Sequence, residues 1–233
     1  FRFNTMATIL QLETATQVCS AAISINGETV ALKVQMASNI HAGSLTLFIK
    51  DVMDTAGLGF SDLDAVAVSK GPGSYTGLRI GVSTAKGLCF ALDLPLIGID
   101  TLQMMSAGFL ATQEDYKGLV CAMIDARRME VFTALFDTQL DYIGATEAKI
   151  IDEHSFADEL SASNITFIGD GALKCAAVIE HVNASFSEQN FNSAANMSKL
   201  ALKAYKNAEF EDVAYFEPFY LKDFVLTTPK KKV

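Results

Sequence analysis

The dipeptide Asn26-Gly27 separates two segments of strand-forming residues, and it restricts the fold of the N-terminal region more than any other feature. Asn-Gly is favoured in the two-residue turn of a β-hairpin, because both positions there need positive φ angles. The segments at 18–25 and 29–34 are therefore expected to be antiparallel strands. A further alternating segment at 8–13 adds a third strand, so the chain is expected to open with a three-stranded meander.

A helix and a buried strand are expected to follow the meander. Apolar residues recur at helical spacing between His41 and Ala56, and Gly57 is suited to end that helix. The short apolar segment 65–69 is expected to be a fully buried strand, and a second helix is expected at 77–92, before Pro95. The order β-β-β-α-β-α predicts an α/β lobe with a mixed sheet.

A second α/β unit is expected to begin near residue 100. The first unit is expected to begin at Met6, which looks like a natural start. The pattern predicts lobes at 6–99 and 100–233, and it leaves open whether the last helix and the tail pack back on the first lobe. A strand is also expected at 96–99. The expected elements of the second lobe are strands at 119–124, 129–137 and 166–169, a turn at 125–128, and helices at 101–110, 155–160, 171–181 and 194–206.

Composition excludes several classes of protein. Half of the residues are hydrophobic, 19% are charged and the net charge is -9, which argues against a chain that binds nucleic acid by itself. No run of eighteen apolar residues or signal-peptide pattern is present, so no membrane association is expected. The four cysteines are widely spaced, without a CxxC pair. They are expected to be buried free thiols of a cytoplasmic protein.

The segment SKGPGSYTGLRIG at 69–81 resembles a phosphate-binding loop but fits neither common motif. It lacks the GxxxxGK[ST] of a Walker loop, and the third glycine of a GxGxxG fingerprint falls one position late. Two interpretations stay open. The loop is either a tight crossover whose Ser74 or Thr76 caps the next helix, or a weak anion site at a helix N-terminus. The candidate anion contacts in this loop are Lys70, Gly71, Gly73, Ser74 and Arg79.

Small residues recur every four positions after this loop, at Gly77, Gly81 and Ala85. Residues four apart share one helical face, and glycine within a helix is unfavourable unless another backbone approaches closely. This face is expected to pack against a second helix, with packing on the protein's own sheet as the alternative.

Catalytic and metal-binding patterns find little support. The three histidines are scattered, no serine lies in GxSxG, and the position four residues after His41 is Leu45, so neither a hydrolase triad nor a metal site is expected. The segment 125–128 is expected to be a salt-bridged turn in which Asp125 pairs with Arg127 and Arg128, with a catalytic role as the alternative. An ATP-dependent small-molecule kinase remains the alternative function.

Four motifs together resemble the bacterial TsaB (YeaZ) family over nearly all of the chain from Met6. They are ILQLETATQVCSAAI, the glycine loop, DARRMEVFTALF and the GDGA at 169–172. The resemblance implies the two-lobed α/β fold of actin, sugar kinases and heat-shock ATPases, with a mixed sheet in each lobe. It also implies a noncatalytic dimerisation subunit of the complex that forms N6-threonylcarbamoyladenosine at position 37 of tRNAs.

The same resemblance implies partners and sites. The catalytic paralogue TsaD would bind this chain and be activated by it, the ATPase TsaE would join, tRNA would bind through the complex, and the chain alone would form a homodimer. No cofactor is expected, although weak ATP or ADP binding at a partner interface is left open, with Thr14, Gly169 and Gly171 as further contacts. The implied interface lies on helices 41–56 and 77–92, and its residues are Leu45, Phe48, Ile49, Val52, Gly77, Leu78, Gly81, Ser83, Thr84, Ala85 and Leu88.

Overall fold

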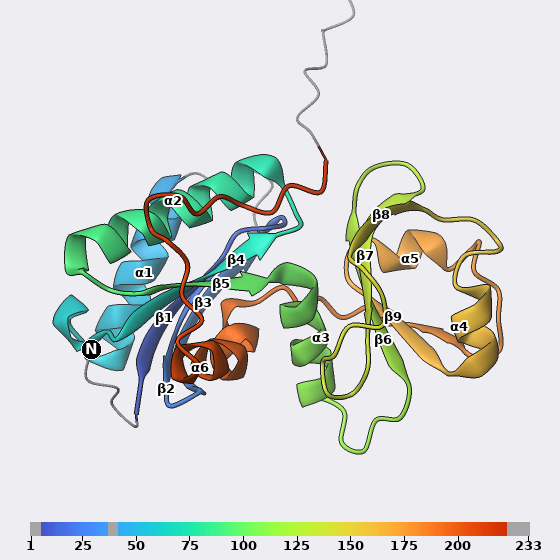
Figure 1. Cartoon of the computed structure of the whole chain (residues 1–233), viewed down its shortest axis with the longest axis horizontal. Helices are drawn as coiled ribbons and strands as arrows, with labels where there is room; N and C mark the ends of the chain where they lie inside the picture. The colour runs from blue at the N-terminus through green and yellow to red at the C-terminus, as the bar shows by residue number, and fades with distance from the viewer. Residues whose placement is uncertain (1–5, 37–41, 223–233) are drawn as a thin grey trace, which may run out of the picture.

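The computed structural model describes residues 6–36 and 42–222, which form two lobes side by side (Figure 1). Each lobe is built on a five-stranded mixed sheet. Within these residues, no helix combines the length and the hydropathy that a bilayer crossing requires. The expectations for His41 lie outside the described residues.

The first sheet has the strand order β3-β2-β1-β4-β5. Its first three strands are antiparallel, and Asn26 and Gly27 have φ angles of 51° and 82°, which confirms the predicted hairpin and meander. β4 pairs in parallel with β1 and β5 with β4. The strands are β1 (Thr8–Glu13), β2 (Val18–Ile25), β3 (Glu28–Met36), β4 (Ala65–Gly71) and β5 (Leu96–Asp100).

Two helices cover one face of this sheet, α1 (Ala42–Ala56) and α2 (Tyr75–Leu92), and a 3-10 turn, η1 (Phe60–Asp62), follows α1 (Figure 1). Leu10 and Leu12 of β1 point into the core beneath them. α2 begins two residues earlier than predicted, because the Ser74 hydroxyl accepts a hydrogen bond from the Gly77 N–H at 3.3 Å and caps the helix at Ser74.

The second sheet has the order β10-β9-β6-β7-β8. Its strands are β6 (Leu119–Asp125), β7 (Glu130–Phe136), β8 (Glu147–Ile150), β9 (Ile165–Ile168) and β10 (Ala184–Phe186), and the helices α4 (Ala157–Ala162) and α5 (Ala172–Cys175) pack on its outer face. The sequence did not predict β8 and β10, which have four and three residues. The helix predicted at 171–181 is wrong beyond Cys175, where the chain turns and buries Ile179 in the outer core.

α3 (Thr101–Ala111) lies between the two sheets (Figure 1). One continuous core there joins the inner faces of both sheets, with Ile9 and Ile97 from the first and Ala122 and Phe136 from the second. The helix predicted from Ala194 begins as the 3-10 turn η2 (Ala194–Met197) and continues as α6 (Ser198–Lys206). α6 contacts the first sheet although it follows the second in sequence.

The segment after α6, residues 207–222, runs back along the first lobe and is called the tail below. The N–H of Glu211 donates to the carbonyl oxygen of Leu96 at 2.9 Å, at the β5 edge of the first sheet. Further on, Lys222 forms an ion pair with Glu130 of the second lobe. The tail therefore contacts both lobes.

Candidate partner-binding surface and glycine loop

The turn between β1 and β2 packs directly against the glycine loop. The N–H of Ser74 donates to the carbonyl oxygen of Ala15 at 2.6 Å, and the Thr14 hydroxyl donates to the carbonyl oxygen of Gly77 at 2.7 Å. A Cβ on Gly73 would come within 2.4 Å of the Ala15 oxygen. The glycines of the loop therefore serve this close backbone approach.

The tail covers the other side of the loop. The N–H of Phe219 donates to the carbonyl oxygen of Lys70 at 2.7 Å, and a Cβ on Gly71 would lie 2.4 Å from the Phe219 oxygen. The Arg79 guanidinium lies 4.2 Å from the centre of the Tyr75 ring, and its Nε donates to the Tyr220 hydroxyl at 3.2 Å. Arg79, the Ser74 N–H and the Lys70 carbonyl are thus engaged within the chain, and an anion contact at this loop stays a prediction.

The second pair of glycines also serves packing. A Cβ on Gly169, whose φ is 99°, would meet the carbonyl oxygen of Met123 at 2.2 Å. A Cβ on Gly171 would lie 3.0 Å from the carbonyl carbon of Ile124. Both glycines let the chain after β9 lie close to β6, so their geometry is explained without a ligand.

Glu13 is a fully buried carboxyl group at the end of β1. Burial raises its pKa from 4.5 to about 7, although the N–H of Ala15 donates to Oε1 at 2.5 Å and opposes this change. Its Oε2 has no hydrogen-bond partner among the residues described. With a pKa of about 7, about half of these carboxyl groups hold a proton at pH 7, because burial disfavours the charged form.

Most of the predicted interface residues are buried inside the first lobe. A Cβ on Gly81 would lie 2.4 Å from the Thr14 hydroxyl oxygen and 3.3 Å from a methyl group of Val68. The small-residue face of α2 therefore packs on the protein's own turn and sheet, the alternative that the sequence left open, and an interface with another subunit on this helix stays a prediction. The buried residues of the predicted set are Leu45, Phe48, Ile49, Val52, Gly77, Leu78, Gly81 and Ala85.

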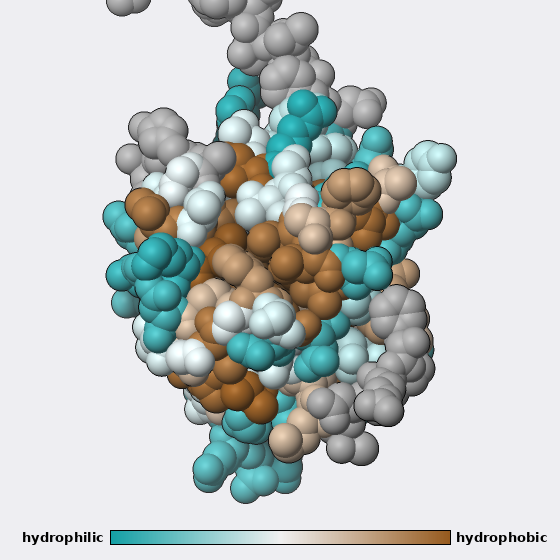
Figure 2. Space-filling view, turned by 90° about the vertical axis from the view of Figure 1, so that its left-hand side faces the viewer, coloured by the Kyte–Doolittle hydropathy of each residue, from teal (hydrophilic) through white to brown (hydrophobic). Residues whose placement is uncertain are grey.

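Three of the predicted interface residues stay accessible: Ser83 is exposed, and Thr84 and Leu88 are half-buried. Phe90, which the sequence analysis did not single out, is 85% exposed on the same helix. Apolar side chains gather at this end of the first lobe, where α1 and α2 finish (Figure 2). The apolar end, as it is called below, is defined by the exposed Phe60 and Phe90, and the half-buried Leu58, Leu92 and Leu94 are close to them in sequence.

The tail also forms a groove with α2, of about 360 Å³. Lys86 donates to the carbonyl oxygens of Ala214 at 3.2 Å and Phe216 at 2.9 Å, and Ser83 lines the groove between Lys86 and Arg79. No local pattern in the sequence pairs the tail with α2, so these contacts could not be predicted.

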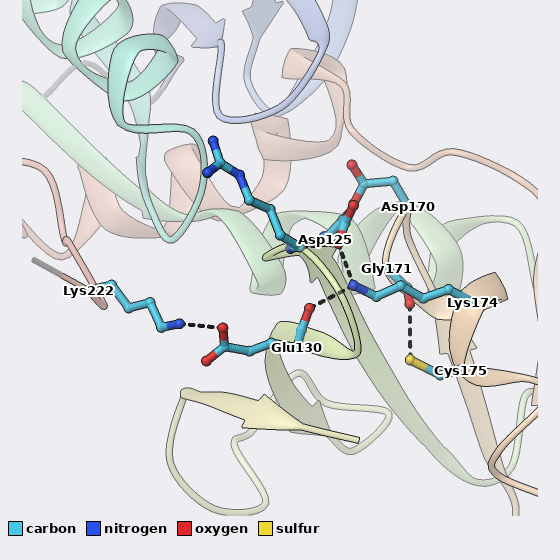
Figure 3. A network of polar contacts seen from close by, with 8 residues as sticks. Asp125, Glu130, Asp170, Gly171, Lys174, Cys175 and Lys222 are labelled. Atoms are coloured by element: carbon cyan, nitrogen blue, oxygen red, sulfur yellow. Dashed lines mark hydrogen bonds and ion pairs between the residues drawn. The ribbon is translucent and has the colours of Figure 1, made fainter. Parts of the chain in front are cut away.

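A polar network connects the β6–β7 hairpin, α5 and the tail (Figure 3). Asp125 pairs with Lys174, and its Oδ1 accepts the N–H of Arg127 at 2.9 Å. Lys174 also donates to the carbonyl oxygen of Glu130 at 2.7 Å. The predicted pairing of Asp125 with the arginine side chains is therefore wrong, because a lysine from α5 occupies that carboxylate.

Comparison with known proteins agrees with this architecture. The family model described as TsaD, tRNA N6-adenosine threonylcarbamoyltransferase, matches residues 33–216. The Escherichia coli protein "tRNA threonylcarbamoyladenosine biosynthesis protein TsaB" is 31% identical, over 93% of this chain and 95% of its own. The structure of YeaZ from Pseudomonas aeruginosa has a TM-score of 0.80 at 26% identity, and the match covers 92% of this chain and all of that one.

A more distant structure shows the class of fold. The activator of the 2-hydroxyisocaproyl-CoA dehydratase from Clostridium difficile superposes with a TM-score of 0.51 at 11% identity, over 87% of this chain and 97% of its own. The fold is that of the actin, sugar kinase and heat-shock ATPase class, as predicted. Within that class, the chain belongs to the TsaB family of TsaD-like proteins.

Proposed function

We propose that this chain is a noncatalytic subunit of the machinery that forms N6-threonylcarbamoyladenosine in tRNA, and that it binds and activates the catalytic relative TsaD. The observation that carries this proposal is the apolar end of α1 and α2, where Phe90 is 85% exposed. Exposed aromatic side chains within apolar surface are typical of protein interfaces. Membership of the TsaB family supports TsaD as the partner.

The geometry of the glycine loop supports a role without chemistry of its own. Its backbone is packed between the β1–β2 turn and the tail, and Arg79 is engaged by Tyr75 and Tyr220. These contacts argue against the kinase alternative, which needs the loop to approach phosphates. We further propose that TsaE joins the complex, that a homodimer forms through the apolar end when TsaD is absent, and that the chain is cytoplasmic.

The decisive experiment compares Phe90→Glu with Val182→Glu in binding to the TsaD of the same organism. Val182 is 94% exposed in the second lobe, so both substitutions place a charge on a surface and neither is expected to disturb folding. Light scattering should show a heterodimer for the wild type and for Val182→Glu. Phe90→Glu should bind at least about tenfold more weakly, and the rate of threonylcarbamoyl transfer should fall with the loss of complex.

Two results would contradict the proposal in different ways. Equal binding by Phe90→Glu would show that the apolar end is not the docking surface. Failure of the wild-type chain to bind TsaD, with ATP turnover by this chain alone, would favour the kinase.

A further inference from the structure

The tip of the β6–β7 hairpin holds two consecutive arginines in a disfavoured backbone conformation. Arg127 and Arg128 have φ angles of 76° and 53°, in the left-handed region. Glycine or asparagine is usual at such positions, because an ordinary side chain is crowded there by the backbone. Both arginines are exposed, so burial of their side chains in the core does not account for their presence.

Hydrogen bonds hold this turn in place from beneath. The N–H of Asp125 donates to Oδ1 of Asp170 at 3.0 Å, and the Asp125 carboxylate accepts the N–H of Arg127. Across the hairpin, the N–H of Ala126 donates to the carbonyl oxygen of Glu130 at 3.1 Å. The backbone of the tip is therefore fixed before any ligand binds.

Two acidic neighbours of the tip, Asp125 and Glu130, are already paired with lysines. Asp125 pairs with Lys174 of α5 and Glu130 pairs with Lys222 of the tail (Figure 3). In the part of the chain that the structure describes, no ion pair reaches either guanidinium. The tip thus presents two exposed guanidinium groups that form no ion pair with the residues described, on a chain whose net charge is -9.

We propose that Arg127 and Arg128 bind the phosphodiester backbone of RNA when the chain is part of its complex. This inference rests on the proposed function, which makes a tRNA the substrate of the complex. Guanidinium groups bind phosphate oxygens through paired N–H donors, and a fixed backbone reduces the entropy lost on binding. An exposed hairpin tip suits a polymer that lies across it, whereas a small anion is usually held in a concave site.

The overall charge of the chain limits how much of the RNA affinity this hairpin can supply. A chain with an excess of acidic groups does not hold RNA by itself, so the hairpin adds to an affinity that the partner supplies. Contacts to phosphates do not read the base sequence, so the two arginines would position the tRNA rather than select it.

The test uses the complex of the full chain with TsaD, and it compares Arg127→Gly/Arg128→Gly with Lys199→Ala/Lys206→Ala. Both double variants remove two exposed positive charges, and the control lysines lie on α6. Glycine also suits the left-handed backbone, so the arginine variant should unfold at an equal or higher denaturant concentration than the wild type. Binding of tRNA is followed by filter binding between low and physiological salt.

The arginine variant is expected to bind tRNA about tenfold more weakly at low salt, and its slope of log K against log salt should fall by between about 1 and 2. The control should match the wild type. Unchanged affinity and slope in the arginine variant would overturn the proposal, and so would a loss of affinity that the control shares.

Light scattering on the same samples separates this proposal from the proposed function. A heterodimer that forms normally but binds tRNA weakly supports the RNA contact. A variant that no longer binds TsaD would show that the hairpin contacts protein instead. Absence of a heterodimer with the wild-type chain would overturn both proposals, whereas an unchanged tRNA slope in an intact heterodimer would overturn only this one.

Discussion

The carbonyl oxygen of Thr14 lies where a side chain on Gly77 would begin, because a Cβ on that glycine would come within 2.0 Å of the oxygen. Thr14 belongs to the turn after β1 and Gly77 to the first turn of α2. Their contact fixes the position of α2, and with it the apolar end, relative to the first sheet.

This contact predicts opposite effects for two alanine substitutions in one helix. Gly77→Ala should lower the free energy of unfolding by at least about 2 kcal/mol, since the turn or the helix must move. Gly87 is exposed in the same helix with no atom within 4 Å of its Cβ position, so Gly87→Ala should raise it by about 0.5–1 kcal/mol. Urea unfolding measures both. A Gly77→Ala protein as stable as the wild type would show that the contact is not tight.

The raised pKa of Glu13 predicts that the protein loses stability as pH rises. Its pKa is about 7 in the folded protein and 4.5 is its ordinary value, so the folded state holds its proton more tightly. Stability from this group is complete below pH 4.5 and is lost as pH rises to about 7. The difference between these two pKa values limits the contribution of this group to the free energy of unfolding to about 3 kcal/mol.

Glu13→Gln tests this dependence, because the amide has the shape of the neutral acid and its oxygen can still accept the Ala15 N–H. The variant should match the wild type at pH 4.5 and exceed it in free energy of unfolding at pH 8, by up to about 3 kcal/mol. Parallel pH profiles for the two proteins would show that Glu13 ionises normally when folded.

Local patterns predicted the first lobe well. The Asn26-Gly27 turn, the alternation in β1 and the spacing of Leu45, Ile49 and Val52 each identify an element from residues close in sequence. Periodicity also predicted which side of α2 is closely packed. It could not identify the partner of that side, because Thr14 is 63 residues away from Gly77 in the chain.

Long-range contacts explain the errors at the candidate sites. Lys174 pairs with Asp125 across 49 residues, and Tyr220 reaches Arg79 across 141. The arginines adjacent to Asp125 looked like its partners only because they are close in sequence. Phe90 was missed because an apolar residue in a helix is usually buried, and only the path of the chain shows that this one is exposed.

The part of the tail around Tyr220 is expected to open more often when Tyr220 is replaced by alanine. The Tyr220 ring lies 4.7 Å from the Tyr75 ring, centre to centre, and its hydroxyl accepts from Arg79. Tyr220→Ala should lower the free energy of unfolding by only about 1 kcal/mol, because the pair lies near the surface. Limited proteolysis should cleave the variant within residues 212–222 faster than the wild type. Tyr215→Ala is the control, since Tyr215 is 84% exposed; equal cleavage of the two variants would contradict the prediction.

All four cysteines are expected to resist thiol reagents in the folded protein. Each is buried, and burial raises the pKa of Cys19 to about 11 and those of Cys89 and Cys121 to about 12. The reactive thiolate is therefore scarce at pH 8, and access is blocked as well, so labelling should be at least about a hundredfold slower than in guanidinium chloride. Val182→Cys supplies an exposed thiol that should react at once. Rapid labelling of a native cysteine would contradict this prediction and show that the helix or strand that carries it opens readily. Hydrogen exchange would then be measured first on α2, which carries Cys89.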